Sequence, residues 1–111
     1  MHAMGRSARR SEQLALAAEL RRQGLSPAAI GRTLGVQYGI NARIALRVAN
    51  GLTQQDVATE WSRRWPDDPK TFKNVSYWES WPSPTGHAPS LAVLDRLAQI
   101  YRCDVADLVA G

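Results

Sequence analysis

The sequence predicts an all-helical protein of about seven helices, on three observations. Apolar residues recur at spacings of three and four, as in Leu91, Leu94, Leu97 and Tyr101, which is the periodicity of a helix with one buried face. Residues that typically begin helices precede such stretches repeatedly. No stretch alternates apolar and polar residues for long enough to indicate a strand. The 111 residues are enough for one domain with a single modest core.

The chain begins with a segment that has no helical pattern. Residues 1–6 show no periodicity and are expected to form a flexible tail. Residues 7–23 consist mainly of strong helix formers, with alanine and leucine between arginine and glutamate. Gly24 follows them, and glycine suits the left-handed conformation that commonly ends a helix. The first helix is therefore predicted over residues 7–23.

A second helix is predicted directly afterwards. Ser26 is a good N-cap, and the proline that follows it suits the first helical position. We expect this helix to end at about Leu34, because Gly35 breaks it, and residues 36–40 to connect it with the next element. Residues 7–40 are accordingly interpreted as an N-terminal helical extension.

Two helices with a turn between them are predicted next. Residues 41–49 have helical spacing of apolar side chains. Thr53 then begins another helix, since Asp56 completes a capping box three residues later. This helix has to end by Trp65, because Pro66 disfavours helical geometry in the residue before it.

The rest of the chain predicts three shorter helices. Thr71 caps a helix over residues 72–80, which the following prolines prevent from continuing. Ser90 caps the clearly amphipathic helix over residues 91–101. Asp104 begins a last short helix, with an aspartate at the capping-box position.

The charge of the chain is unevenly distributed. Eight arginines and two glutamates give residues 1–50 a net charge of +6, whereas six basic and eight acidic side chains give residues 51–111 a net charge of −2. A basic excess of this kind is typical of proteins that bind a polyanion such as nucleic acid. A solvated face that keeps the protein soluble is the alternative interpretation.

Several function classes receive no support from the sequence. Cys103 is the only cysteine and His2 and His87 are isolated, which argues against a disulfide and against a metal site. No nucleophile set, paired catalytic carboxylates or glycine-rich phosphate loop is visible, so we expect neither an enzyme nor a cofactor nor a small-molecule ligand. No apolar run approaches a membrane span, and Glu12 and Glu19 interrupt any signal peptide, so a cytoplasmic protein is expected.

Three segments resemble the helix-turn-helix domain of the phage repressor and Cro class of transcription regulators. The segment R-V-A-N-G-L-T-Q-Q-D-V-A is similar to the end of that fold's first helix and the start of its second. The segment N-V-S-Y-W-E resembles the third, DNA-reading helix, and P-S-L-A-V-L-D-R-L-A-Q-I-Y-R-C-D-V-A-D-L the fourth and fifth. The resemblance implies a five-helix DNA-binding domain over residues 41–111, preceded by two N-terminal helices. The turn of the motif is longer than in the family. Residues 62–70 stand between its second and third helices, and part of this stretch is an insertion.

The resemblance also implies roles for particular residues. Phe72, Lys73, Asn74 and Tyr77 are expected to point outward from a recognition helix capped by Thr71, while Val75 and Trp78 point into the core. Lys73 would then contact guanine, Asn74 adenine or a phosphate, and Phe72 a thymine methyl group.

Further residues are implied around that helix. Gln54 stands where the family contacts a phosphate, and Lys70 and Ser76 are secondary candidates for backbone contacts. Arg47 and Glu79 are expected to form a structural ion pair. The implied partner is double-stranded DNA, and a homodimer is expected because such readers usually bind paired half-sites.

Three alternatives stay open at the level of sequence. The first is a helical protein-interaction module, such as an antitoxin-like or adaptor subunit, which the −2 charge of residues 51–111 favours. The second is a resolvase-type helix-turn-helix in L-S-P-A-A-I-G-R-T-L-G-V, with its reading helix from Tyr38 onward. The third concerns the tryptophans, which could stack on unpaired bases, although their helical spacing favours core packing. Apart from these alternatives, the N-terminal arginines are expected either to contact phosphates or to face solvent; they are Arg9, Arg10, Arg21, Arg22 and Arg32.

Overall fold

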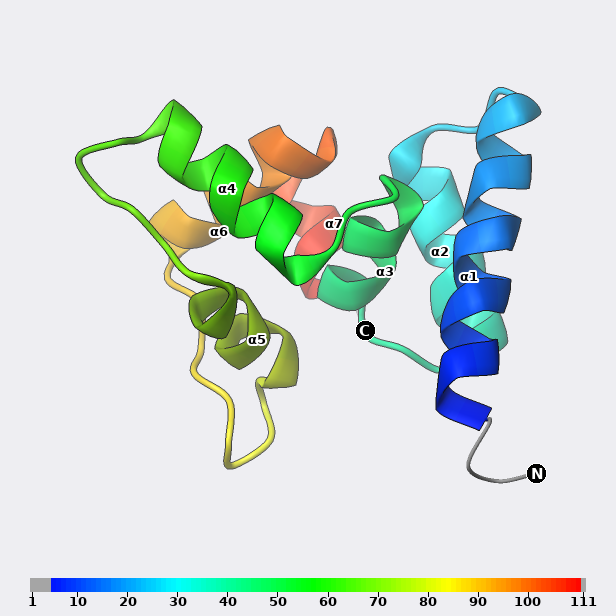
Figure 1. Cartoon of the computed structure of the whole chain (residues 1–111), viewed down its shortest axis with the longest axis horizontal. Helices are drawn as coiled ribbons and strands as arrows, with labels where there is room; N and C mark the ends of the chain where they lie inside the picture. Colours follow the sequence, from blue (N-terminus) through cyan, green and yellow to red (C-terminus); the bar gives the residue numbers. More distant parts are fainter. Residues whose placement is uncertain (1–4, 111) are drawn as a thin grey trace.

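The computed structural model describes residues 5–110, with side chains from Arg9 onward. Within this range the chain forms seven helices and no strand (Figure 1), which confirms the all-helical prediction. The helices are α1 Gly5–Arg22, α2 Pro27–Tyr38, α3 Ala42–Ala49, α4 Gln54–Arg64, α5 Phe72–Ser80, α6 Leu91–Tyr101 and α7 Val105–Val109. The first helix begins at Gly5 rather than Ser7, and residues 1–4 of the expected tail lie outside the described residues.

Short-range capping interactions begin the helices at the positions that the sequence indicates. The Ser26 hydroxyl accepts a hydrogen bond from the Ala29 N–H at 3.2 Å. Thr53 and Asp56 form a reciprocal capping box, in which each side chain accepts from the other's backbone N–H at 3.0 and 2.9 Å. Ser90 caps α6 in the same way as Ser26 caps α2. These bonds satisfy N–H groups that have no partner inside the helix.

The second helix is longer than the sequence analysis predicts. Gly35 lies inside α2, which continues to Tyr38, so the predicted break and the connection over residues 36–40 are wrong. The helix is closed instead by Gly39, which has a φ of 64° and donates its N–H to the Gly35 carbonyl at 3.0 Å. A glycine inside a helix costs only about 1 kcal/mol relative to alanine. The burial of α2 against its neighbours is sufficient to offset this.

Two apolar clusters share α3, which lies between α1 and α2 on one side and α4 to α7 on the other (Figure 1). The larger cluster consists of Leu46, Val57, Ala58, Trp61, Val75, Trp78, Leu94, Leu97, Ala98, Ile100, Tyr101 and Leu108. The smaller cluster consists of Ala17, Ile30, Leu34, Ala45, Val48 and Ala49. A Cβ atom on Gly31 would lie 3.0 Å from a methyl carbon of Leu46, so glycine at this position allows α2 and α3 to approach closely. The N-terminal helices therefore pack on the same central helix as the remainder of the protein.

Burial of α3 also argues against the second DNA-binding motif considered from the sequence. Tyr38 is the last residue of α2 and does not begin a reading helix. The next helix, α3, has five of its eight residues buried. The structure thus has no helix that starts at Tyr38, and α3, packed between the two apolar clusters, offers little exposed surface to a DNA groove.

The tryptophans pack rather than form an exposed platform. Trp61 is 1% exposed and Trp78 is 7% exposed, and their ring centroids lie 5.4 Å apart. Trp65 lies edge-on to Trp61, with a centroid distance of 5.1 Å. Aromatic rings in such tilted and edge-on contacts stabilise a core beyond the area that they bury. The tryptophans thus hold α4 against α5.

A buried arginine on α3 fixes the ends of two other helices. Arg43 is 3% exposed, and its guanidinium donates to the carbonyl oxygens of Trp78, Trp81 and Leu108 at 2.9, 2.6 and 3.1 Å. These carbonyls lie at the C-terminal ends of α5 and α7, where backbone acceptors have no helical partner and where a positive charge is favourable. Desolvation lowers the pKa of Arg43, and the negative charge of Glu79 opposes this. Arg43 therefore ties α5 to the core.

Candidate nucleic-acid interface

The candidate reading helix α5 has one face in the core and one face in solvent. Val75 is 2% exposed and Trp78 is buried, whereas Phe72 is 47% and Tyr77 is 40% exposed. Lys73 is also exposed. The division follows the helical period, because residues three and four apart lie on the same face. An aromatic ring, an ammonium group and a phenol are thereby presented outward from a short, well-anchored helix.

The first turn of α5 is closed by its own side chains. The Asn74 amide oxygen accepts from the Thr71 N–H at 2.9 Å and from the Thr71 hydroxyl at 3.3 Å. A bidentate contact to adenine requires both the oxygen and the nitrogen of an asparagine amide. Because the cap occupies the oxygen, Asn74 can offer an external ligand only its amide N–H groups. This geometry suits a phosphate oxygen better than adenine.

The connection between α4 and α5 is tied down at several points. The Trp61 indole N–H donates to the Asp68 carbonyl at 2.7 Å, and the Ser62 hydroxyl exchanges hydrogen bonds with the backbone of Lys70 at 3.1 and 3.2 Å. The Asp68 carboxylate pairs with Arg96 at 3.1 Å and with Lys70 at 3.2 Å. The long turn therefore has a definite path between the helices. Lys70 is a candidate phosphate contact, and its charge is partly offset by the Asp68 carboxylate, which also pairs with Arg96.

A charged network joins α3, α4 and α5. Arg47 donates to both carboxylate oxygens of Glu79, from Nε at 2.6 Å and from Nη2 at 3.1 Å, and from Nη1 to the Leu52 carbonyl at 3.0 Å. Glu79 is 5% exposed. Gln54 donates its side-chain amide to the same carboxylate at 2.9 Å. Gln54, expected from the resemblance to touch a phosphate, thus turns toward Glu79 and holds the start of α4 against the end of α5.

The loop after α5 supports the tyrosine on that helix. The His87 ring stacks on the Tyr77 ring with a centroid distance of 4.5 Å, and the His87 backbone N–H donates to the Tyr77 carbonyl at 3.0 Å. Stacking restricts the rotamers of Tyr77, so its hydroxyl is held in a limited set of positions. The sequence showed His87 only as an isolated histidine and did not reveal this contact. Ser76, the remaining candidate on α5, is half-buried.

No protein-family model, curated protein or solved structure matches the chain. Among the residues that the structure describes, no group of three or more His, Cys, Asp and Glu side chains is placed to hold a metal ion. None of the described helices is both long enough and apolar enough to cross a membrane. The surfaces of this chain are therefore the source of information about its function.

A groove of about 1120 Å³ runs beside the start of α5. Its lining includes Arg9 and Arg10 from α1, Ile44 from α3, Gln54 from α4 and Phe72 from α5. The N-terminal part of α1 thus lines one groove with the first residues of both α4 and α5. Sequence reasoning left the position of these arginines open, since only tertiary packing brings α1 to this site.

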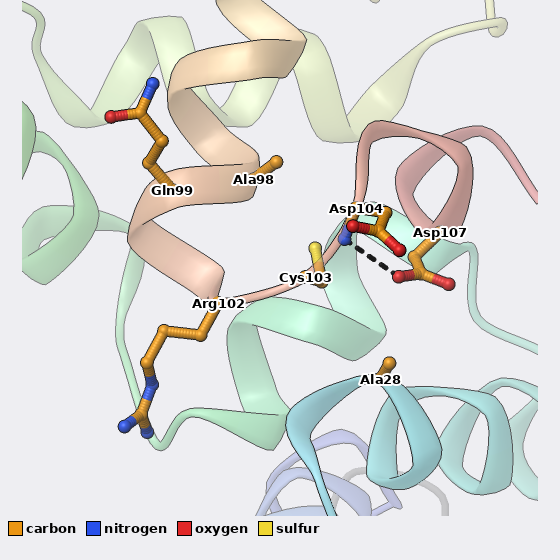
Figure 2. A pocket seen from close by; sticks show the side chains of 7 residues that line it. All are labelled: Ala28, Ala98, Gln99, Arg102, Cys103, Asp104 and Asp107. Carbon is orange, nitrogen blue, oxygen red and sulfur yellow. Dashed lines mark hydrogen bonds between the residues drawn. The ribbon is translucent and has the colours of Figure 1, made fainter.

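A second, more open pocket of about 420 Å³ lies where the end of α6 and the start of α7 meet α2 (Figure 2). Burial raises the pKa of the Cys103 thiol to about 12, and the charges of Asp107 and Asp104 add to the effect. The thiol is therefore protonated at neutral pH and is a poor nucleophile. The Asp107 carboxylate accepts from the Asp104 N–H at 2.9 Å and is engaged in capping α7 (Figure 2). Asp104 and Asp107 of this pocket thus serve to cap α7.

Proposed function

We propose that the protein is a DNA-binding transcriptional regulator that reads duplex DNA in the major groove through α5. The resemblance of the sequence to repressor and Cro-class regulators supplies the expectation, with α3 to α7 corresponding to the five helices of that class. The observation that carries the proposal is the division of α5 into an anchored face, with Val75 and Trp78, and an exposed face, with Phe72, Lys73 and Tyr77. A reading helix needs this division, because outward side chains must reach base edges while the inner face sets their position.

The exposed side chains suit different parts of a duplex. Lys73 can donate to the O6 and N7 atoms of guanine, and Phe72 can contact a thymine methyl group. Tyr77 is a further reader on the same face, held by its stacking on His87. The amide N–H groups of Asn74 can donate to a phosphate at the first turn of α5, where the helix dipole also favours negative charge. Thr71 contributes by capping that turn.

Backbone contacts complete the proposed interface. Ser76 and Lys70 are secondary phosphate contacts, although the pairing of Lys70 with Asp68 reduces its contribution. Gln54 acts through Glu79 by fixing the angle between α4 and α5. We further propose that the protein binds DNA as a homodimer in the cytoplasm, since readers of this kind occupy two half-sites one helical turn apart, about 34 Å.

A binding titration at two salt concentrations tests the proposal. Fluorescence anisotropy with pooled genomic duplex fragments is expected to show binding at low salt that weakens steeply as salt rises, because each neutralised phosphate releases counterions. Selection from the pool should then enrich a preferred site. Failure to bind any duplex at low salt would overturn the proposal.

Substitutions on α5 test whether this helix is the reader. Lys73→Ala and Tyr77→Ala should weaken binding to the selected site more than binding to unrelated duplex, by about 1–3 kcal/mol of lost discrimination for each good base contact. Arg32→Ala is a matched control for Lys73→Ala, because Arg32 is an exposed cation on α2 outside the proposed interface and, like Lys73, is not among the ion pairs of the described residues. Equal losses on both duplexes would mean that α5 does not read sequence.

A helical protein-interaction module is the second candidate function. The net charge of −2 over residues 51–111 favours it, because an acidic surface repels the DNA backbone. Binding of a protein partner through an apolar interface should change little between the two salt concentrations, whereas DNA binding should fall steeply. The same titration therefore separates the two candidates.

A further inference from the structure

The first helix reaches the surface on which the start of α5 lies. Arg9, Arg10 and Leu14 of α1 line the same groove as Gln54 at the start of α4 and Phe72 at the start of α5. In Figure 1 the N-terminal end of α1 and the helix α5 lie along the same lower side of the molecule. The N-terminal part of α1 is thus a neighbour of the proposed DNA-reading surface, although more than sixty residues separate Arg9 from Phe72 in the sequence.

The position of α1 relative to α5 is set by packing and by hydrogen bonds. Ala17 of α1 is fully buried in the cluster that α1 shares with α2 and α3. Arg21 donates to the Ala49 carbonyl at 2.6 Å and joins the end of α1 to the end of α3. On its other side α3 holds α5 through the pair of Arg47 with Glu79 and through Arg43. The arginines at the start of α1 are therefore carried on a scaffold that also carries α5.

The charge along this groove is positive. Arg9 and Arg10 are exposed, and neither is among the ion pairs that the described residues form. The only carboxylate among the lining residues belongs to Glu79, which Arg47 neutralises at 2.6 Å. Arg9 and Arg10 thus place two positive charges, with no ion-pair partner among the described residues, on the rim of the groove across from α4 and α5. The rim is suited to a polyanion that extends past the end of the reading helix.

We propose that α1 is part of the DNA interface and that Arg9 and Arg10 bind backbone phosphates flanking the base pairs read by α5. This inference rests on the proposed function and adds a second contact region to it. Phosphate contacts by arginine strengthen binding to any sequence and do not select bases. The basic N-terminal half of the chain thereby supplies the positive charge that residues 51–111 lack.

The salt dependence of binding measures these contacts directly. Each phosphate contact contributes about 0.9 to the slope of log affinity against log salt. The double variant Arg9→Ala/Arg10→Ala should therefore flatten the slope by about 1.8, which corresponds to a roughly 12-fold smaller loss of affinity between 50 and 200 mM salt. Its preference for the selected site over unrelated duplex should be unchanged.

Two further variants control for charge and for folding. Arg32→Ala/Arg102→Asn removes the same charge from two exposed positions outside the groove that are likewise absent from the ion pairs of the described residues. Asparagine is used at position 102 because it tolerates the left-handed backbone found there. This variant should leave the slope nearly unchanged, and Arg9→Lys/Arg10→Lys should retain the original slope. Urea unfolding of each variant, followed by tryptophan fluorescence, checks that the fold is kept.

The outcomes are distinguishable from those that concern the reading helix. If the unmodified protein binds duplex but the Arg9→Ala/Arg10→Ala variant has the same slope as the unmodified protein, this inference is wrong and the proposed function stands. If the control variant flattens the slope equally, the effect is one of net charge and the inference is also wrong. If the unmodified protein binds no duplex, the proposed function and this inference fail together.

Discussion

Replacing Glu79 by alanine is the most informative test of how α5 is held. The side chains of Glu79 and Arg47 are 6% and 16% exposed, and the carboxylate accepts from Nε and Nη2 of Arg47 and from the Gln54 amide. Its removal leaves the Arg47 guanidinium with the Leu52 carbonyl at 3.0 Å as its remaining hydrogen-bond partner. Removal of one partner from a buried pair costs about 3–5 kcal/mol, because the other charge stays desolvated without compensation.

This free energy converts into a large change in melting temperature. Unfolding entropy of about 2.1 cal/mol/K per residue corresponds to roughly 4 °C per kcal/mol for a chain of this length, so Glu79→Ala should lower the midpoint by about 13 to 21 °C. Urea unfolding followed by circular dichroism and tryptophan fluorescence gives the free energy directly. Under the proposed function the loss should also weaken binding to the selected DNA site, since the same carboxylate joins α4 to α5.

A matched substitution separates this effect from the loss of any glutamate. Glu60 accepts hydrogen bonds from Arg63 and Arg64 on the surface of α4, and surface pairs contribute about 0.2–1 kcal/mol. Glu60→Ala should therefore lower the unfolding free energy by no more than about 1 kcal/mol. Equal destabilisation by Glu79→Ala and Glu60→Ala would refute the reasoning. The double variant Arg47→Met/Glu79→Leu should recover much of the loss, because neither charge of this pair is then left without its partner.

Three further measurements follow from the structure. Arg43→Met leaves the carbonyls at the ends of α5 and α7 without their donor, so it should lower the unfolding free energy by about 3 kcal/mol or more in urea titrations. A change of less than about 0.5 kcal/mol would exclude the capping role. Arg63 and Arg64 lower the pKa of Glu60 below its usual 4.5. The stability that Glu60 contributes is therefore present above pH 4.5 and lost as the pH falls below it, so the unmodified protein should lose its advantage over Glu60→Gln in that range; a constant difference would contradict the shift. Burial raises the pKa of the Cys103 thiol from 9.0 to about 12. Iodoacetamide should therefore label the thiol slowly at about pH 9 in the folded protein and rapidly in urea. Similar labelling rates in both states would contradict the raised pKa.

Most of the helical boundaries could be predicted from the sequence because they depend on neighbours along the chain. The side chains of Ser26, Thr53 and Ser90 cap helices through residues three positions later. Gly35 is the instructive exception. It was expected to end α2, but a glycine only weakens a helix, and the helix continues to Gly39 because packing on α3 stabilises it.

The residues of the candidate interface were predictable to a lesser degree. The resemblance to repressor and Cro-class regulators implied an inner face of α5 with Val75 and an outer face with Lys73, and the burial of Val75 and the exposure of Lys73 agree with that division. It could not reveal that the Asn74 oxygen closes the cap or that Gln54 turns to Glu79. The orientation of these two side chains depends on whether the fold brings a hydrogen-bond partner within reach, and the sequence alone does not show this.

The sequence by itself determined that the chain is helical and where most helices begin. These properties follow from interactions within about four residues, which no other part of the molecule is needed to complete. Tertiary structure alone decided that Arg43 caps α5 and α7 and that Arg9 and Arg10 line one groove with the start of α5. Such contacts join residues far apart in the chain, so they exist only once α3 is buried between its two clusters and fixes every other helix relative to α5.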